Sequence, residues 1–266
     1  MSNRKLARPC LLLVAILTVT AWSCSAVSNL PNPFASATPT ATQTFTPTIT
    51  PSPTPTWTPT ATPVPTGTVL QKAPGGGTRF FDYDGGYMID VPADWVAVLL
   101  EPGDLEAAIS EFANSNPSLA NALKNSQATA SKAFRMVAYD KIVSHYTGGY
   151  VANFTAAMFQ DKAMASLPMD LVVQVTMDQV KKQIPAAKTK ILPSAVNAHA
   201  LPIGLSEVEV TVRTPDGNQI AIYEKWCFVQ TKNALVVITL SAPQSTSDAV
   251  KPLFDTVFDG IKLLQP

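Results

Sequence analysis

A long stretch without charged side chains determines where a folded domain can begin in this 266-residue chain. No Asp, Glu, Lys or Arg occurs between Arg8 and Lys72. Within the stretch, residues 31–68 contain 14 threonines and 10 prolines in a loose Thr-Pro repeat. Proline removes backbone donors and fixes φ, and the segment has too few large apolar side chains to build a core. The sequence therefore predicts a disordered Thr/Pro-rich linker over residues 24–77, with a flexible glycine-rich joint at 74–78.

The composition of this linker favours an extended spacer. Polyproline II is the expected conformation, with a rise of about 3.1 Å per residue. Residues 31–68 would then reach up to roughly 120 Å, several times the ~30 Å hydrocarbon thickness of a bilayer. Dense threonine with proline is also typical of O-glycosylated stalks. We expect the segment to hold a domain away from a membrane surface.

The residues before this stretch have the features of an export signal. Arg4, Lys5 and Arg8 precede an apolar run at 10–22, and no acidic residue lies among them. A basic segment followed by about 7–15 apolar residues is typical of a secretory signal peptide, whereas a membrane-spanning helix needs about 20. The pattern predicts that the rest of the chain lies outside the cytoplasm.

The end of the leader, Ala21-Trp22-Ser23-Cys24, resembles a bacterial lipobox, in which a cysteine is diacylated and becomes the new N-terminus. Ser23 and Cys24 fit the pattern, whereas Ala21 stands where leucine is usual and Trp22 is bulky for its place. The resemblance implies a lipoprotein signal peptide that ends just before Cys24, and membrane anchoring through lipid on Cys24. Two alternatives stay open, an uncleaved N-terminal anchor helix and ordinary cleavage after Ala26.

The remaining cysteine and the histidines form no motif of catalysis or metal binding. Cys227 lies in an apolar strand, where a cysteine is usually a small buried hydrophobe. His145 and His199 have no second ligand at metal-binding spacing, and we interpret both as surface or hydrogen-bonded side chains. The Asp82–Gly85 sequence lacks the further ligands of a calcium loop. The sequence predicts no catalytic residue, no metal and no cofactor.

The charge balance argues against nucleic-acid binding. The whole chain has zero formal net charge, and residues 72–266 carry 16 basic and 19 acidic side chains. A nucleic-acid binder would be clearly basic. The folded part is instead mildly acidic.

A globular domain is expected over residues 78–266. A hairpin is predicted around Asp84–Gly86 and a final edge strand at 261–264. Further strands are expected at 95–99, 133–139, 150–160, 205–214, 219–230 and 234–241. Helices are expected at 104–126 with a break at Asn116-Pro117, at 168–184, and at 245–258, where Pro252 should introduce a kink or mark the true start. Helices that segregate from an antiparallel sheet define the α+β class.

Two segments of this domain resemble the Mog1/PsbP-like family. The run from Gly86 to Trp95, GYMIDVPADW, is similar to the opening motif of the family, and residues 252–263 resemble its end, where a helix leads into the last strand. The likeness covers residues 79–264. It implies an α/β/α sandwich around a central antiparallel sheet and a non-catalytic binding or assembly module, and no functional residue can be transferred.

Three functions are compatible with these features. The leading hypothesis is a lipid-anchored extracytoplasmic binding or scaffold domain and not an enzyme. Its partners would be the membrane, through Cys24, and an unknown protein or cell-envelope component. Its place would be the outer face of the bacterial cell membrane, or the outer membrane where the host has one. A ligand receptor would need a closed apolar pocket of a few hundred Å³. A cell-wall-acting surface hydrolase would need His145 or His199 beside an acid in a cleft.

Overall fold

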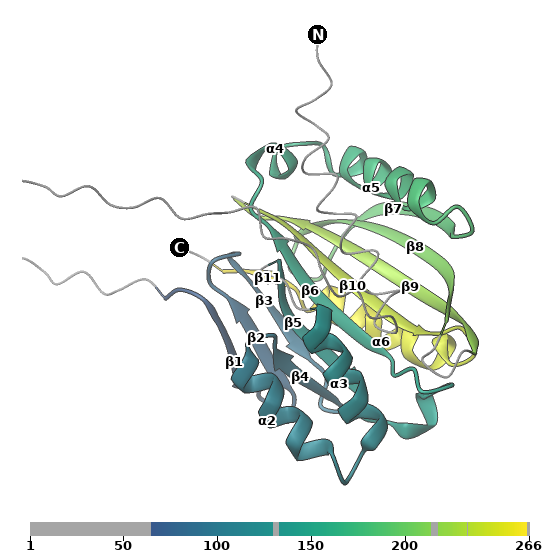
Figure 1. Cartoon of the computed structure of the whole chain (residues 1–266). Coiled ribbons are helices and arrows are strands. Elements are labelled where there is room, and N and C mark those ends of the chain that lie inside the picture. The colour runs from purple at the N-terminus through teal and green to yellow at the C-terminus, as the bar shows by residue number, and fades with distance from the viewer. Residues whose placement is uncertain (1–64, 130–132, 214–217, 233, 265–266) are drawn as a thin grey trace, which may run out of the picture. The chain divides into compact units, whose positions relative to one another are not determined.

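The computed structural model describes residues 65–266 except 130–132, 214–217, 233 and 265–266 (Figure 1). The predicted signal peptide over residues 1–23, Cys24 and most of the predicted linker lie outside the described residues. Among the helices that are described, none is long and apolar enough to cross a membrane.

Strands and helices follow one another along the chain in an irregular order. The strands are β1 (Thr68–Lys72), β2 (Thr78–Asp82), β3 (Tyr87–Val91), β4 (Trp95–Leu99), β5 (Phe134–Asp140), β6 (Asn153–Phe159), β7 (Lys188–Val196), β8 (Pro202–Arg213), β9 (Gln219–Gln230), β10 (Leu235–Pro243) and β11 (Lys262–Leu263). The helices are α2 (Pro102–Phe112), α3 (Pro117–Thr129), the 3-10 turn η2 (Val143–His145), α4 (Lys162–Ala165), α5 (Met169–Gln183) and α6 (Ser247–Asp259).

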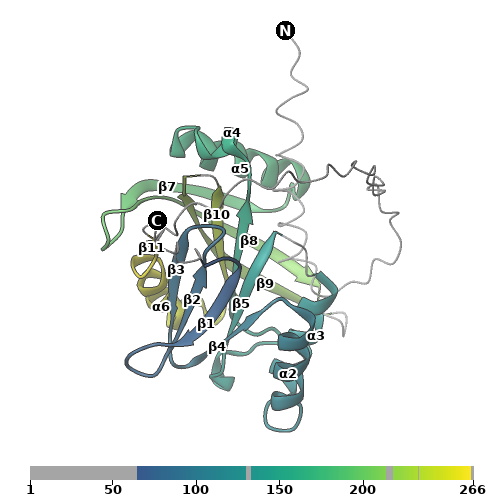
Figure 2. The same cartoon turned by 90° about the vertical axis from the view of Figure 1, so that its left-hand side faces the viewer.

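The strands form two antiparallel sheets. The larger sheet has seven strands in the order β4-β5-β6-β10-β9-β8-β7, and the smaller has four in the order β1-β2-β3-β11. Figure 2 shows the smaller sheet in front of the larger one, with β11 beside β3. Every strand pair in the described residues is antiparallel, and the helices lie outside the sheets and pack on their faces, so the predicted α+β class is confirmed.

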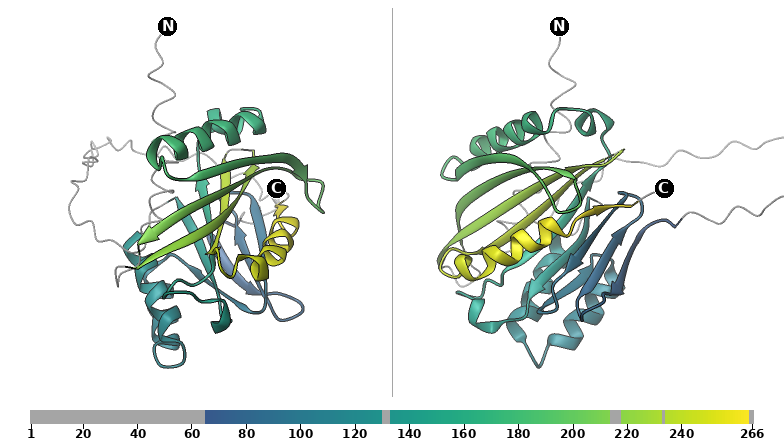
Figure 3. Two further views of the ribbon diagram at one scale, coloured as in Figure 1. Left: turned by 90° about the vertical axis from the view of Figure 1, so that its right-hand side faces the viewer. Right: turned by 180° about the vertical axis from the view of Figure 1, so that it is seen from behind.

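Both faces of the seven-stranded sheet are covered. Helices α2 and α3 pack on one face near β4 and β5, and α5 packs on the same face near β8 and β9. The opposite face packs against α6 and the four-stranded sheet, and Figure 3 shows α5 and α6 on opposite sides. The largest apolar core lies on that second face and includes Phe80, Ile89, Phe154, Ile238 and Phe254, all with no exposed surface. Helices thus lie on both sides of a central sheet, as expected.

Local signals in the sequence position several of these elements. Gly86 adopts φ 72° at the predicted hairpin turn, where its N–H donates to the Asp82 carbonyl at 2.8 Å. Asn116 caps α3, because its Oδ1 accepts from the Leu119 N–H at 3.1 Å, and Pro117 is the first residue of that helix. These turns and caps confirm the predicted hairpin and the predicted break between two helices.

Two strands were absent from the sequence-based prediction. Strand β1 lies within residues 24–77, which were predicted to be linker, and its Val69 and Leu70 pair with Phe81 and Phe80 of β2. The folded domain therefore includes β1, which precedes residue 78. Strand β7 contains Pro193 at the edge of the large sheet, where the register shifts after Leu192. Proline is tolerated at such edges because its missing N–H is not needed there.

The structure also resolves the alternatives that the sequence left open for Pro252. Helix α6 begins at Ser247, so Pro252 lies inside the helix and does not mark its start. Pro252 is exposed. Water can therefore hydrogen-bond to the carbonyl group one turn earlier, which lacks a helical N–H partner because proline has none.

Candidate functional site

Polar side chains gather where β5 ends and the loop 141–152 leads into β6. The Asp140 side chain has no exposed surface, and its Oδ1 accepts from the Ile142 N–H at 2.8 Å. Its Oδ2 lies 2.5 Å from Nδ1 of His145, the last residue of η2. The structure therefore brings His145 together with a buried acid. His199 lies elsewhere, on an exposed turn where its N–H donates to Asn197 Oδ1 at 2.9 Å.

The Asp140–His145 pair orients an imidazole ring without placing a nucleophile beside it. A carboxylate on Nδ1 fixes the ring and leaves Nε2 for a further interaction, which is the arrangement used by catalytic dyads. In the part of the chain that the structure describes, His145 Nε2 makes no hydrogen bond to a hydroxyl or thiol. The same described residues contain no group of three or more His, Cys, Asp or Glu that could hold a metal ion.

The loop that carries His145 forms hydrogen bonds with two helices, α3 and α6. The Tyr146 hydroxyl donates to the Asp140 carbonyl at 2.8 Å and accepts from Asn116 Nδ2 of the α3 cap at 3.0 Å. The Thr246 hydroxyl, at the start of α6, donates to the His145 carbonyl at 3.1 Å. The loop therefore connects the two faces of the large sheet, and this connection is the role that its geometry shows.

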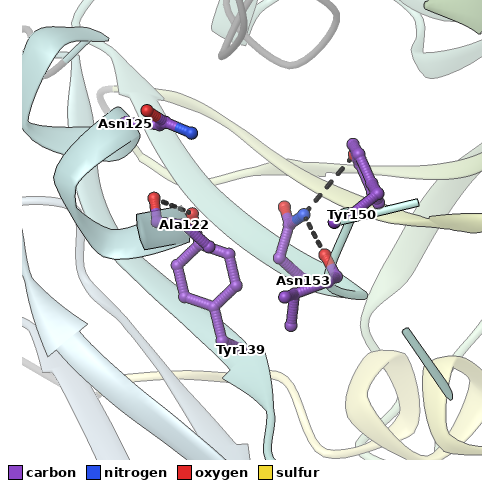
Figure 4. Close-up of a pocket in the computed structure, with 7 residues that line it drawn as sticks. Ala122, Asn125, Tyr139, Tyr150 and Asn153 are labelled. Atoms are coloured by element: carbon purple, nitrogen blue, oxygen red, sulfur yellow. Dashed lines mark hydrogen bonds between the residues drawn. The ribbon is translucent and has the colours of Figure 1, made fainter. Parts of the chain in front are cut away.

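A small polar pocket opens beside this loop (Figure 4). It has a volume of about 30 Å³ and is lined by Ala122 and Asn125 of α3, Tyr139 of β5, residues 149–151 and Asn153 of β6. The Tyr139 hydroxyl donates to the Ala122 carbonyl at 3.1 Å, and Asn153 Nδ2 donates to the Val151 carbonyl at 3.0 Å. A volume of this size holds one or two water molecules. It is far smaller than the pocket that a small-molecule receptor needs.

A buried polar row continues behind the pocket across the large sheet. The hydroxyls of Tyr150 and Ser241 lie 2.5 Å apart, and Ser241 is paired in register with Glu224 of β9. Glu224 is 2% exposed and accepts from Trp226 Nε1 at 2.9 Å. Burial raises the pKa of Tyr139 to about 12, and burial with the nearby Glu224 charge raises the pKa of Tyr150 well above its ordinary value.

We expect burial to delay the ionisation of Tyr139 in the folded protein. The pKa of Tyr139 is raised from 10.0 to about 12 by burial, so the unfolded chain loses this proton first as the pH rises. The stability that protonated Tyr139 contributes is complete below pH 10 and is lost between pH 10 and about 12. A spectrophotometric phenolate titration of the folded protein and of its Tyr139→Phe variant measures this. Simultaneous ionisation of all six tyrosines near pH 10 would contradict it.

The other sequence-based candidates have structural roles in the described domain. Cys227 is buried as a free thiol, as predicted, and burial raises its pKa. The carboxylates of the hairpin bind an arginine, since Arg135 Nε lies 3.0 Å from Asp82 Oδ2 and Arg135 Nη2 lies 2.8 Å from Asp84 Oδ2. These contacts join the hairpin to β5 of the large sheet.

A larger groove lies along the edge of the domain between β1, β4 and α2. Its volume is about 420 Å³, and it is lined by Thr68, Val69, Leu70, Val96, Ala97, Val98, Leu99, Asp104, Ala107, Ala108 and Glu111. Sequence reasoning missed this groove because one of its walls, β1, had been assigned to the linker. A short run of residues with high strand propensity, Thr68-Val69-Leu70, was the available signal.

Comparisons with known proteins find likenesses of fold only. No family model and no curated protein matches the chain. The solution structure of cyanobacterial PsbP (CyanoP) from Synechocystis sp. PCC 6803 is 16% identical, with a TM-score of 0.45, over 72% of this chain and 94% of that chain. The crystal structure of LpqN, involved in cell envelope biogenesis of Mycobacterium tuberculosis, is 10% identical, with a TM-score of 0.39, over 74% of this chain and 91% of that chain. A PsbP structure is thus among those that this α+β domain resembles, as expected from the sequence.

Proposed function

We propose that this chain is a lipid-anchored extracytoplasmic domain that binds a macromolecular partner without catalysis. The observation that carries the proposal is the order of features in the sequence. A basic leader and an apolar run end at Cys24, and a charge-free Thr/Pro-rich segment then precedes a single folded domain. Each feature serves export, anchoring or spacing, and together they place the domain away from the membrane that holds its lipid.

The geometry of the domain supports binding through its surface. The polar pocket beside loop 141–152 accommodates only water, and the Asp140–His145 pair faces no hydrogen-bonded nucleophile in the described residues. The groove along β1 and β4 is large and open. These features favour recognition of part of another molecule over enclosure of a small ligand. The lipid on Cys24 supplies attachment to the membrane, and the partner is a protein or another component of the cell envelope.

The proposal places the domain on the outer face of the bacterial cell membrane, or on the outer membrane where the host has one. The linker sets the distance. In an extended conformation its residues 31–68 would span up to roughly 120 Å, which would let the domain reach through or along a wall layer while its anchor stays in the bilayer.

A membrane-impermeant amine-reactive crosslinker on intact cells tests this location and binding role. Lys188 and Lys190 are suitable targets, because their side chains are 83% and 70% exposed on the edge strand β7. We expect both lysines to react on intact cells and the chain to form a discrete crosslinked species with its partner. A variant with Lys188→Arg and Lys190→Arg is the matched control for the labelled positions. Reaction that occurs only after lysis would contradict the proposal.

A further inference from the structure

The groove between β1, β4 and α2 lies between two free strand edges. Strand β4 ends the seven-stranded sheet and β1 ends the four-stranded sheet. Within the described ranges β4 pairs only with β5, and β1 pairs only with β2. The other side of each strand presents backbone N–H and C=O groups without a strand partner. An exposed edge of this kind is a site where an extended peptide adds as a further strand.

The walls of the groove are apolar and lined by small or branched side chains. Val69 of β1 is 36% exposed, and Val96 and Leu99 of β4 are half-buried. Ala107 and Ala108 of α2 form the opposite wall without filling it. Strand β4 has five residues, which corresponds to about 17 Å of extended chain. The groove therefore has the length and the lining for about five residues of an extended peptide.

The helix that borders the groove carries only acidic charge. Glu101 at its N-cap, Asp104, Glu106 and Glu111 are all exposed, and α2 contains no basic residue. None of the four forms an ion pair with another described residue. Asp104 and Glu111 line the groove and are seven residues apart, about two helical turns, so both lie on the same side of α2. Two unpaired carboxylates along an apolar groove favour a positively charged occupant.

The linker of this chain does not fit that description. It has no charged side chain between Arg8 and Lys72, and its many prolines lack the N–H groups that strand addition needs. An anionic membrane surface is also disfavoured, because the carboxylates of α2 would repel it. A basic segment of a different protein fits both the charge of the groove and the free backbone groups of its edges.

We propose that the groove binds an extended basic peptide segment of another cell-envelope protein, which adds as a strand along the free edge of β4. Small apolar side chains of the segment pack against Val69, Val96 and Ala107. Its lysine or arginine side chains bind Asp104 and Glu111. This inference rests on the proposed binding function and names the chemistry of the partner.

Titration of the full-length protein in detergent micelles with a defined peptide tests the inference. The probe is a fluorescent hexapeptide of alternating valine and lysine with blocked ends, and its anisotropy reports binding. We expect saturable binding that weakens about fivefold when Asp104→Asn and Glu111→Gln are combined, and also weakens as salt is added. Ala107→Arg, which fills the groove and reverses its charge, should abolish binding.

Matched controls separate groove binding from general attraction between charges. Glu106→Gln removes one charge from the same helix at a position that does not line the groove, so this variant should bind as the wild type does. A peptide with alternate N-methylated amides should not bind, because it lacks strand hydrogen bonds. Thermal unfolding confirms that each variant is folded.

Three results would overturn the inference. They are the absence of saturable binding to the wild type, unchanged binding to the Ala107→Arg protein, and equal binding of a valine-glutamate peptide. The measurement does not depend on where the protein resides. If the peptide does not bind and intact cells still show surface labelling, the groove assignment fails while the proposed function stands. If the peptide binds and the lysines react only after lysis, the proposed location fails.

Discussion

Replacement of Cys24 by alanine is expected to move the protein from the membrane fraction of cells to the soluble fraction. The two acyl chains proposed on this cysteine contribute about 0.8 kcal/mol for each buried methylene, and dual acylation is what makes such anchoring stable. Among the described helices, none has the length and apolar character needed to cross a membrane. Fractionation of cells that express each form, followed by immunoblotting, measures the effect.

A second cysteine in the leader supplies the matched control. Cys10 lies in the apolar run and is predicted to leave with the signal peptide, so Cys10→Ala should remain in the membrane fraction. A Cys24→Ala protein that also stays in the membrane would reject lipid anchoring and favour the uncleaved anchor helix. Release of both variants would mean that substitutions in the leader disturb its processing in general, and that the effect is not specific to Cys24.

Replacement of Phe254 by alanine is expected to cause a large loss of folding stability. Phe254 has no exposed surface and lies on α6, in the core between the two sheets. The centroids of its ring and of the Trp95 ring of β4 are 6.4 Å apart. Removal of a buried phenylalanine side chain costs about 3–5 kcal/mol through lost burial and the cavity that remains. A domain of this size is stable by roughly 5–15 kcal/mol, so much of that free energy would disappear. Denaturant unfolding followed by circular dichroism gives the value.

The control for this prediction lies on the same helix. Asp259 is exposed and forms no ion pair among the described residues, so Asp259→Ala should change the free energy of unfolding by less than about 0.5 kcal/mol. Equal losses for the two variants would contradict the assignment of Phe254 to the core. A loss well below about 3 kcal/mol for Phe254→Ala would mean that the Phe254 side chain is not tightly packed in this core.

Elements with strong local signals were predictable from the sequence. Val208, Val210 and Val212 alternate with polar residues, and in β8 these three valines are buried while Glu209 and Thr211 are exposed. Period-two alternation and turn chemistry act within a few residues, so they can be read without knowledge of the rest of the chain. The meander, the hairpin at Gly86 and the Asn116 cap of α3 belong to this group.

Edge strands were harder to predict because their neighbours define them. Strand β1 follows a charge-free segment and has only one half-buried apolar residue, Leu70, so pairing with β2 is what defines it as a strand. Strand β7 contains Pro193, which counts against a strand by propensity and is tolerated only because this strand lies at the edge of the sheet. Tertiary position outweighed local preference in both cases.

The candidate sites depend on contacts that spacing does not reveal. Asp140 and His145 are five residues apart, and they meet only because η2 turns the chain back toward the end of β5. The groove takes its walls from β1, β4 and α2, which are separate segments, and one of them was hidden in the predicted linker. Its acidic border on α2 could be read from the sequence, whereas the facing strand edges could not.

The mass of the mature protein tests the account most directly. Intact protein purified from the membrane fraction is analysed by mass spectrometry, together with its N-terminal peptide. The proposed anchoring predicts a chain that lacks residues 1–23 and begins with diacylated Cys24. A chain that retains Met1, or one that begins unmodified at Val27, would contradict it.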